Sequence, residues 1–504
     1  MEEKKLYGDT GSYINNYVLV VTLASLLVYI IYQRRQGKKY NYPPGPTGLP
    51  LFGSLFSLIL TKRPQYEVLN DWTRKFGDVI SFKLLNTRFV LLNNEQMAHD
   101  VMGSMDVMGR MPVGIIKELA GTENAGIAFC SGQVWKEQRR FFLSVFKRSD
   151  SKGIGLEEIV GAQVVCLLAE VEKKNGTGFD PNSMVQTSIS NIIAKIITGV
   201  TYEYDDVDFN RLMAHANRVF DLLGPAGLLS SVPILSALPT PALRQLTKEW
   251  DGMLDFIRKN IEDHKVDFNP NQEPRDFIDS YMQVMANMKT ENNKGSFNET
   301  NLLACSFDLF LGGLETASTI ISWALHTLAS YPEEQRRVRR EILDVIGQER
   351  RPRFSDRHKL PVTMATITEC IRFRPSFDVQ LAHVAENDAK VGGYDIPKGT
   401  VVSVNMSHLF MSPSLWEEPL EFRPDRFLDE DGEYDRKREP IYFGTGRRVC
   451  PGEQLARIEL FFIITCILQR FTISLAEGVP RDLSCDHSFT NRPDPFKIHA
   501  KKIV

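Results

Sequence analysis

Cys450 is the residue best placed for chemistry in this 504-residue chain. It lies in the run FGTGRRVCPGE at positions 443–453. Apolar residues recur at spacings of three and four from Pro451 onward, which predicts a helix, and proline suits a first helical position. Free backbone N–H groups and the positive end of the helix dipole would then face the Cys450 sulfur and lower the pKa of its thiol. A thiolate placed in this way can bind a metal ion. The alternative is a buried structural cysteine, as most free cysteines are.

An acid next to an alcohol forms the second candidate for chemistry. Glu315 and Thr316 follow Gly312 and Gly313 in residues 299–331, whose apolar pattern predicts one long helix that ends before a proline. Each glycine inside a helix costs about 1 kcal/mol relative to alanine. Either a flat ligand against the backbone or close helix–helix packing must compensate for that cost. Because an acid and a hydroxyl are costly to bury in an apolar helix without partners, we expect the pair to have a function.

Two further pairs have helical spacing. Glu369 and Arg372 are three residues apart, which by itself predicts an ordinary surface ion pair worth roughly a few tenths of a kcal/mol. Trp135 and Arg139 are four residues apart, so both side chains would face the same way on a helix.

The run around Cys450 resembles the haem-binding signature of the cytochrome P-450 superfamily. Its six fixed positions are all matched, by Phe443, Gly444, Gly446, Arg448, Cys450 and Gly452. The resemblance extends in order over nearly the whole chain and is greatest to the microsomal, family-2-like group. It implies a mainly α fold with small β-sheets (α+β class), in which one large domain binds haem b. Cys450 would be the axial thiolate ligand, with Phe443 beside the cofactor.

Gly312 to Thr316 resembles the family's oxygen-activation motif of small residue, glycine, any residue, acid and threonine. The resemblance implies that Thr316 lies beside the iron-bound oxygen and that Glu315 helps to relay protons from solvent. It also implies a local distortion of the helix, which leaves room for oxygen and water.

Residues 422–427 resemble the family's meander motif, Phe-any-Pro-any-Arg-Phe. In the family this segment meets the helix of Glu369, so the resemblance implies a buried charged triad of Glu369, Arg372 and Arg426. Its role would be structural, behind the cysteine loop.

The two haem propionates need cationic or N–H donors, and the resemblance implies which residues provide them. Trp135, Arg139 and Arg448 match positions that contact the propionates in the family, and His383 and Arg110 are further candidates. For His383 and Arg110 alone, a role as surface polar residues remains the alternative.

Electrons must come from another protein, because the chain has no strand–GxGxxG–helix unit for a dinucleotide and no spare length for a flavin domain. The resemblance implies an NADPH-dependent cytochrome reductase, with cytochrome b5 as a further candidate donor. Basic residues expected on the thiolate side of haem would attract an acidic partner, or form an ordinary solvated face: Lys136, Arg140, Lys147, Arg148 and Arg447.

Composition argues against several classes of protein. The formal net charge of −3 is unlike that of a general nucleic-acid-binding protein. Seven cysteines without a CxxC pair are neither a disulfide framework nor a zinc site. No linker, low-complexity segment or internal repeat divides the chain after residue 50, so we expect residues 41–504 to form the haem-thiolate domain.

Residues 1–40 predict a membrane anchor. Tyr17 to Tyr32 is nearly all apolar, and a start at Tyr13 gives about 20 residues, roughly one bilayer crossing; four basic residues follow. The positive-inside rule then places residues 33 onward in the cytosol. Together with the resemblance, this predicts a single-pass protein of the endoplasmic reticulum membrane. A cleaved signal peptide is the alternative, but its basic residues would precede the apolar run.

The segments from which the family builds its substrate pocket are apolar here, which indicates a lipophilic small-molecule substrate of the fatty acid, sterol or foreign-compound type. The candidate substrate-binding residues are Phe310, Gly312, Phe377, Val379 and Phe489, and the same segments also hold Val113, Ile115, Ile116 and Leu311. Residues 217–241 are apolar and interrupted by proline and glycine. They predict a loop that makes a second membrane contact, with ordinary core as the alternative.

These patterns predict a membrane-bound haem-thiolate monooxygenase that inserts one oxygen atom from O2 into its substrate by hydroxylation or epoxidation. A haem-thiolate isomerase or dehydratase acting on peroxides is one alternative, although such an enzyme does not need the acid–threonine proton relay. A non-enzymatic haem-binding protein is the other, and the intact positions around Cys450 argue against it.

Overall fold

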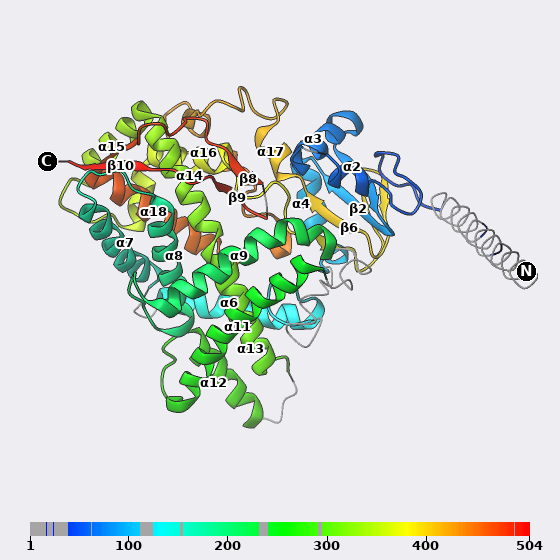
Figure 1. Cartoon of the computed structure of the whole chain (residues 1–504), viewed down its shortest axis with the longest axis horizontal. Coiled ribbons are helices and arrows are strands. Elements are labelled where there is room, and N and C mark those ends of the chain that lie inside the picture. The colour runs from blue at the N-terminus through cyan, green and yellow to red at the C-terminus, as the bar shows by residue number, and fades with distance from the viewer. Residues whose placement is uncertain are drawn as a thin grey trace, which may run out of the picture.

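In the computed structural model of the chain, the described residues are 17, 24 and 39–503, apart from 62, 111–123, 152–154, 231–239, 291–294 and 488. Long helices make up most of the molecule, and a sheet with the short N-terminal helices lies at one side (Figure 1). The mainly helical class with small sheets, predicted from the sequence, is confirmed.

The α-helices are α2 (Leu55–Ile59), α3 (Gln65–Phe76), α4 (Glu95–Gly103), α6 (Gly132–Ser151), α7 (Leu156–Lys173), α8 (Pro181–Thr198), α9 (Val207–Ser230), α11 (Pro241–Asp267), α12 (Phe277–Thr290), α13 (Glu299–Leu314), α14 (Thr316–Ser330), α15 (Pro332–Val345), α16 (Pro361–Phe373), α17 (Met406–Met411) and α18 (Glu453–Arg470). Short 3-10 helices are η1 (Met105–Val107), η2 (Phe354–Lys359), η3 (Pro424–Phe427), η4 (Arg436–Arg438) and η5 (Gly446–Arg448).

The largest sheet has the strand order β1-β2-β6-β3, with β2 and β6 parallel and the other neighbours antiparallel. Its strands are β1 (Val79–Leu84), β2 (Thr87–Leu92), β6 (Val401–Val404) and β3 (His383–Val384). Three antiparallel pairs complete the described strands: β4 (Ala389–Val391) with β5 (Tyr394–Ile396), β7 (Phe471–Leu475) with β10 (Ile498–Lys502), and β8 (Cys485–His487) with β9 (Asn491–Pro493).

Side chains at several helix starts explain where the helices begin. Asn298 accepts a hydrogen bond from the Asn301 N–H at the start of α13, and Thr240 does the same for the Leu243 N–H at the start of α11. Such caps satisfy backbone donors that have no partner inside the helix.

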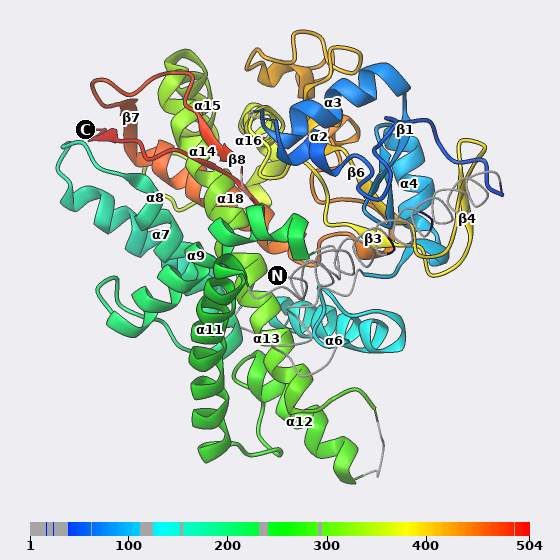
Figure 2. The same cartoon turned by 45° about the vertical axis from the view of Figure 1, so that its right-hand side comes forward.

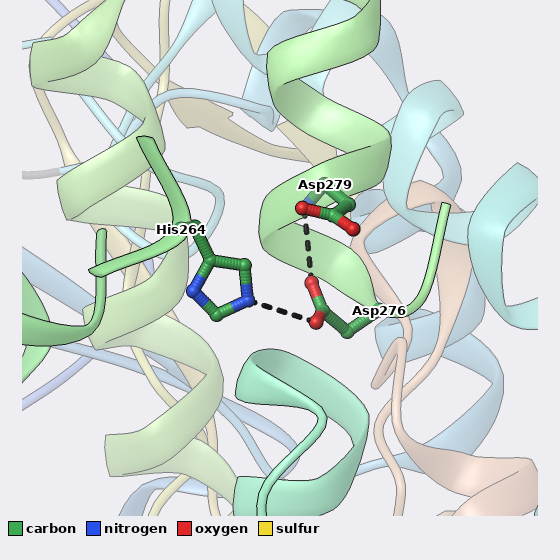
Figure 3. Close-up of side chains that lie close together, drawn as sticks. All are labelled: His264, Asp276 and Asp279. Atoms are coloured by element: carbon green, nitrogen blue, oxygen red, sulfur yellow. Dashed lines mark hydrogen bonds and ion pairs between the residues drawn. The ribbon is translucent and has the colours of Figure 1, made fainter. Parts of the chain in front are cut away.

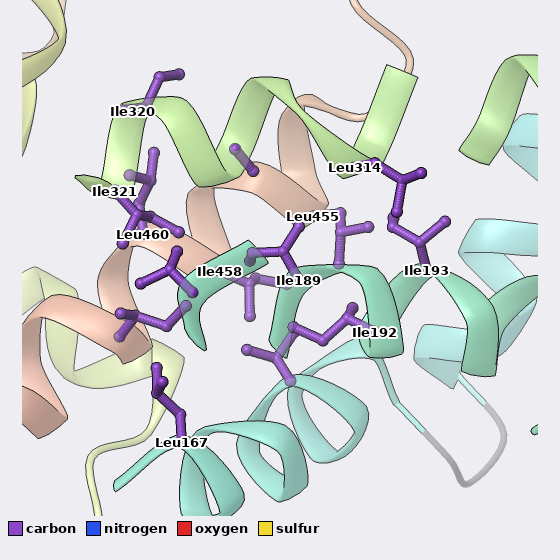
Figure 4. Packing of buried hydrophobic residues seen from close by; sticks show 14 of the residues in the cluster. Leu167, Ile189, Ile192, Ile193, Leu314, Ile320, Ile321, Leu455, Ile458 and Leu460 are labelled. Carbon is purple, nitrogen blue, oxygen red and sulfur yellow. The ribbon is translucent and has the colours of Figure 1, made fainter. Parts of the chain in front are cut away.

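The core lies where α8, α14 and α18 meet, with α7 packed beside them. Every residue of α14 after Thr316 is buried. Figure 4 shows branched side chains from these helices and α13 packed together, among them Ile189, Ile321 and Ile458. Each such side chain contributes about 1.5–3 kcal/mol when fully buried. This packing fixes α13 and α14, which run end to end through the middle of the molecule (Figure 2).

The sequence predicted a membrane anchor and a second membrane-contacting loop, and the structure bears on each differently. The anchor predicted within residues 1–40 lies almost entirely outside the described residues, and no helix among the described residues is long and apolar enough to cross a membrane. The predicted loop at 217–241 is in part wrong: α9 continues through Pro225 to Ser230, and residues 231–239 lie outside the described residues.

Candidate active site

The Cys450 loop leads into the predicted helix, but the helix begins two residues later than expected. α18 starts at Glu453 with Gly452 as its N-cap, so Pro451 precedes the helix instead of opening it. The backbone N–H groups of Gly452 and Glu453 act on the Cys450 sulfur in the direction that lowers the pKa of its thiol. The Cys450 N–H donates to the Phe443 carbonyl oxygen at 2.9 Å. The sulfur therefore faces the amino end of α18, as the sequence predicted.

Close packing against α4 explains the glycine at position 446. Gly446 has φ +78°, and a Cβ atom there would lie 2.1 Å from the Met102 carbonyl oxygen. Only glycine tolerates both conditions. The loop that carries Cys450 is thus seated directly on the α4 backbone.

The pKa of the Cys450 thiol differs from the expectation. Burial by the surrounding protein raises the pKa, and this effect outweighs the two backbone N–H groups and Arg139, which lower it. Although the Cys450 side chain is exposed to solvent, protein atoms crowd around it closely enough for desolvation to dominate. The expected fall in the thiol pKa is therefore wrong for the protein alone. The N–H groups at the helix end stabilise the thiolate less than the loss of water around the sulfur destabilises it.

Trp135, Arg139 and Arg448 lie together, as predicted from their positions. The guanidinium groups of Arg139 and Arg448 lie 5.7 and 4.5 Å from the centre of the Trp135 ring. Arg448 donates to the carbonyl oxygens of Met108 and Cys130, at 2.7 and 2.6 Å. Burial lowers the pKa of Arg448 to about 10.

Arg110 and His383 join the same cluster, Arg110 as a half-buried and His383 as a fully buried residue. Arg110 donates to the Leu381 and Ala382 carbonyl oxygens at 2.9 and 2.8 Å, and burial together with the charge of Arg448 lowers its pKa to about 9. His383 is fully buried and contacts the Val107 carbonyl oxygen through Nδ1 at 2.9 Å. Burial, with the nearby arginines, lowers the pKa of His383 to about 3.

The chemistry of this cluster fits the carboxylates of haem. Its guanidinium groups form no ion pair with any acid among the described residues, and Arg110 and Arg448 depress the pKa of His383. An anion nearby would stabilise their charged forms. His383 also has a buried ring nitrogen, Nε2, with no hydrogen-bond partner in the described part of the chain. The donor set therefore suits anionic groups, as the propionate prediction requires.

The long helix predicted over residues 299–331 is broken at Glu315 into α13 and α14. The Thr316 hydroxyl donates to the Gly312 carbonyl oxygen at 2.7 Å. A Cβ atom at Gly312 would meet nothing within 4 Å, whereas one at Gly313 would lie 2.4 Å from Ile193 of α8. Each explanation considered for the glycines thus applies to one of them: Gly313 permits helix packing, and Gly312 leaves an open approach to the backbone.

Glu315 points to partners that the sequence did not indicate. Its side chain is 2% exposed and accepts a hydrogen bond from the Thr490 hydroxyl at 3.2 Å. Arg492 on β9 lies 3.3 Å from the same oxygen and also pairs with Asp221 of α9. Burial raises the pKa of Glu315, and Arg492 opposes that rise. Sequence spacing could not reveal these partners, because they lie far from residue 315 along the chain.

The three charged residues predicted to meet behind the cysteine loop do so. Arg372 forms a two-pronged pair with Glu369, at 2.7 and 2.8 Å, and Arg426 lies 3.1 Å from the same carboxylate. Glu369 and Arg372 have no exposed side-chain surface. We call Glu369, Arg372 and Arg426 the buried triad. It ties α16 to the segment that precedes the Cys450 loop.

The predicted substrate residues divide into two groups. Phe310 is fully buried and packs edge-on against Phe256 of α11; its role in binding substrate stays a prediction. Phe377 and Phe489 are half-buried and contact each other with ring centres 5.8 Å apart. Val379 is also half-buried. Val113, Ile115 and Ile116 lie outside the described residues.

A separate cluster of metal-ligand residue types is already satisfied without a metal ion. His264 Nε2 lies 2.9 Å from Asp276, which also accepts the Asp279 N–H at the start of α12 (Figure 3). Asp279 pairs with Arg275 at 2.6 Å, and His264 Nδ1 contacts the Asn260 carbonyl oxygen. This cluster joins the end of α11 to the start of α12 and serves as a structural contact.

Comparisons with known proteins agree with the geometry around Cys450. A family model described as Cytochrome P450 matches residues 43–500. Cytochrome P450 2D6 of Pan paniscus is 35% identical over 491 residues, which cover 96% of this chain and 97% of that protein. Cytochrome P450 2D6 of Homo sapiens is 34% identical over 490 residues (95% and 97%), and cytochrome P450 2D15 of Canis lupus familiaris is 33% identical over 500 residues (97% and 98%).

The chain belongs to the cytochrome P450 family. It is accordingly a monooxygenase, and its cofactor is haem b held through a cysteine thiolate. The non-enzymatic alternative is thereby removed.

Proposed function

We propose that this P450 is a membrane-bound enzyme of the endoplasmic reticulum, with its catalytic domain in the cytosol, that oxidises a lipophilic substrate. One oxygen atom of O2 enters the substrate and the other leaves as water, with two electrons drawn from NADPH through a separate reductase. The observation that carries the proposal is the position of Cys450 at the amino end of α18, where the backbone N–H groups of Gly452 and Glu453 act to lower the pKa of its thiol.

Cys450 is the residue proposed to hold the haem iron. Bound haem supplies iron that activates O2, with electron density pushed onto it by the thiolate. Metal binding removes the proton from a coordinating thiol outright, so the raised pKa of Cys450 is no obstacle. Trp135, Arg139 and Arg448, with Arg110 and His383, are proposed to hold the propionates.

Thr316 and Glu315 are proposed to transfer protons to the reacting oxygen at the break between α13 and α14. The Thr316 hydroxyl donates to the Gly312 carbonyl oxygen, and it can exchange that bond for one to a reacting oxygen atom. Glu315 lies next to it in the chain and is held by Thr490 and Arg492. A buried carboxyl group with a raised pKa can pick up a proton and pass it on.

Exposed side chains support the proposed partners. Lys136, Arg140, Lys147 and Arg447 are exposed and would attract the acidic surface of a reductase or of cytochrome b5. Several apolar side chains near the predicted anchor are also exposed, which favours contact with a lipid surface: Leu49, Leu51, Phe52, Ile59 and Leu60.

The proposal is tested with purified protein, a reductase, NADPH and lipid, supplied with fatty acids, sterols and drug-like compounds. Products heavier by one oxygen atom are expected from at least one class. Cys450→Ser should abolish both the thiolate-type haem spectrum and the product, whereas Cys166→Ser, at an exposed cysteine on α7, should change neither. Conversion of peroxides without reductase, and no oxygenated product with it, would favour the isomerase alternative.

Thr316→Ala tests the proton route. We expect product per NADPH to fall by about tenfold or more, because loss of a positioned proton donor is costly, and the consumed oxygen should appear as peroxide. Thr327→Ala is the matched control, since this hydroxyl lies on the same helix, α14, without a hydrogen-bond partner among the described residues. Unchanged yield in Thr316→Ala would refute the role of Thr316.

A further inference from the structure

One arginine joins two carboxylates from distant parts of the chain. Arg492 on β9 lies 2.5 Å from Asp221 through Nη2 and 3.3 Å from Glu315 through Nε. Exposure of the side chains falls along this series, from 36% at Asp221 and 28% at Arg492 to 2% at Glu315. We call these three residues the Arg492 bridge. It leads from the solvent-facing part of α9 to the buried break between α13 and α14.

Aromatic packing runs beside the Arg492 bridge and joins the same elements. Phe220, the neighbour of Asp221 on α9, contacts Phe489 with ring centres 5.9 Å apart. Phe489 in turn contacts Phe377 at 5.8 Å. These rings also join α9 to the β8–β9 turn, so the charged groups are not the sole described contact between these elements. Their arrangement calls for another explanation.

We propose that Arg492 is a positioning residue, which couples the position of α9 to the orientation and charge of the Glu315 carboxyl group. The proposal rests on the proposed function, in which Glu315 supplies protons. In the structure, Asp221 and Glu315 compete for one guanidinium group. Displacement of α9 would withdraw Asp221 and leave Arg492 to Glu315 alone, which stabilises the carboxylate. Return of α9 would restore the competition and favour the protonated acid.

The other groups around Glu315 are consistent with this competition. Burial is the largest influence and raises its pKa; Arg492 lowers the pKa, Asp221 raises it, and the hydroxyls of Thr490 and Thr319 lower it. Asp221 thus acts in the direction opposite to Arg492. An enzyme built in this way would readily donate protons through Glu315 only while α9 is seated over the site.

A cycle of variants tests the coupling through product formed per NADPH. Arg492→Gln removes the cation that joins the two acids. Asp221→Asn removes the negative charge on α9, and Glu315→Gln removes the carboxyl group whose protonation is coupled to it. We expect Asp221→Asn, which leaves Arg492 to Glu315 alone, to lower product per NADPH by about threefold, at the low end of couplings between residues in contact. Arg492→Gln should lower it less, because it removes the group that orients Glu315 but leaves the carboxyl group easier to protonate. In the Glu315→Gln background neither change should have a further effect.

An infrared measurement supplies a readout that a purely structural role would not move. The carbonyl band of protonated Glu315 is identified by its loss in Glu315→Gln. At a fixed pH this band should grow in Arg492→Gln, which removes a cation, and shrink in Asp221→Asn, which removes an anion. Arg492→Lys should restore the band to near its original size. Arg258→Gln, which removes an exposed arginine on α11, should leave the band and the product yield unchanged.

The outcomes separate the inference from the function on which it rests. Equal effects of Arg492→Gln and Asp221→Asn with and without Glu315, or an infrared band that does not respond, would overturn the role of Arg492. If Glu315→Gln alone leaves product per NADPH unchanged, the proton route through Glu315 fails instead. The band shifts would then still report whether α9 and Glu315 are coupled.

Discussion

The buried triad and the Arg492 bridge each contain three charged residues, but their charges are arranged in opposite ways. The triad sets one acid between two arginines, and its side chains are at most 9% exposed. The bridge sets one arginine between two acids, and two of its members are at least 28% exposed. The comparison indicates that a fully enclosed network serves to fix elements, whereas one open to water can be rearranged.

Satisfaction of donors explains the difference. In the triad, Arg372 donates to both oxygens of Glu369 and also to the carbonyl oxygens of Phe410 and Pro419. No water is needed, and loss of one member leaves a buried charge without compensation. In the bridge, water can reach Arg492 and replace a lost partner. Movement of α9 is therefore compatible with the bridge but not with the triad.

Glu369→Ala should have the largest effect, because it leaves two buried arginines without their acid. We expect a loss of about 3–5 kcal/mol in the free energy of unfolding and protein that retains little haem. Denaturant unfolding and the haem content of the purified protein measure this. Glu417→Ala, at an acid whose side chain is 81% exposed, is the control. A stable, haem-loaded Glu369→Ala protein would show that the triad does not fix the scaffold.

Asp276→Asn should have an intermediate and pH-dependent effect, because His264 and Asp276 are buried like the triad but titratable. Burial lowers the pKa of His264, but the hydrogen bond and charge of Asp276 outweigh it and raise the pKa overall. A raised histidine pKa stabilises the fold below the unfolded value of about 6.5, and this contribution disappears as pH rises through the folded value.

Wild type should therefore exceed Asp276→Asn by about 1.5–3 kcal/mol, the range for hydrogen bonds to charged groups, at acidic pH. The difference should shrink as the pH is raised. Thermal unfolding at several pH values measures it, with His358→Gln, an exposed histidine, as the control. A difference that grows with pH would contradict the assigned charge on His264.

Arg492→Gln should have the smallest effect on stability. The residue is partly exposed, and Glu315 can take up a proton when its cation is lost, so we expect a cost of about 1 kcal/mol or less. Denaturant unfolding provides the measurement. A cost that matches Glu369→Ala would remove the distinction between the two networks, and with it the idea that the bridge can open.

Local patterns were sufficient for much of the fold and site. Spacing along a helix predicted the helix that follows Cys450 and the shared face of Trp135 and Arg139. The mainly helical class and the buried triad were predicted from the resemblance of contiguous motifs to the family, since spacing alone indicated a surface ion pair for Glu369 and Arg372. Helix boundaries were less accurate, because α18 begins at Glu453 with Gly452 as its N-cap, and not at Pro451 as predicted. The contact of Phe310 with Phe256 was not predicted, because periodicity shows that a side chain is buried but not which neighbour buries it.

The sequence by itself determined which atoms are available for chemistry: a cysteine before a helix, an acid and a threonine beside glycines, and cations for two carboxylates. Tertiary structure alone decided their environment. Burial raised the pKa of Cys450 against the helix end, and β9 and α9 brought Arg492 and Asp221 to Glu315. The physical reason is that desolvation and charge pairing depend on what surrounds a group in space, and residues 221, 315 and 492 are far apart in the chain.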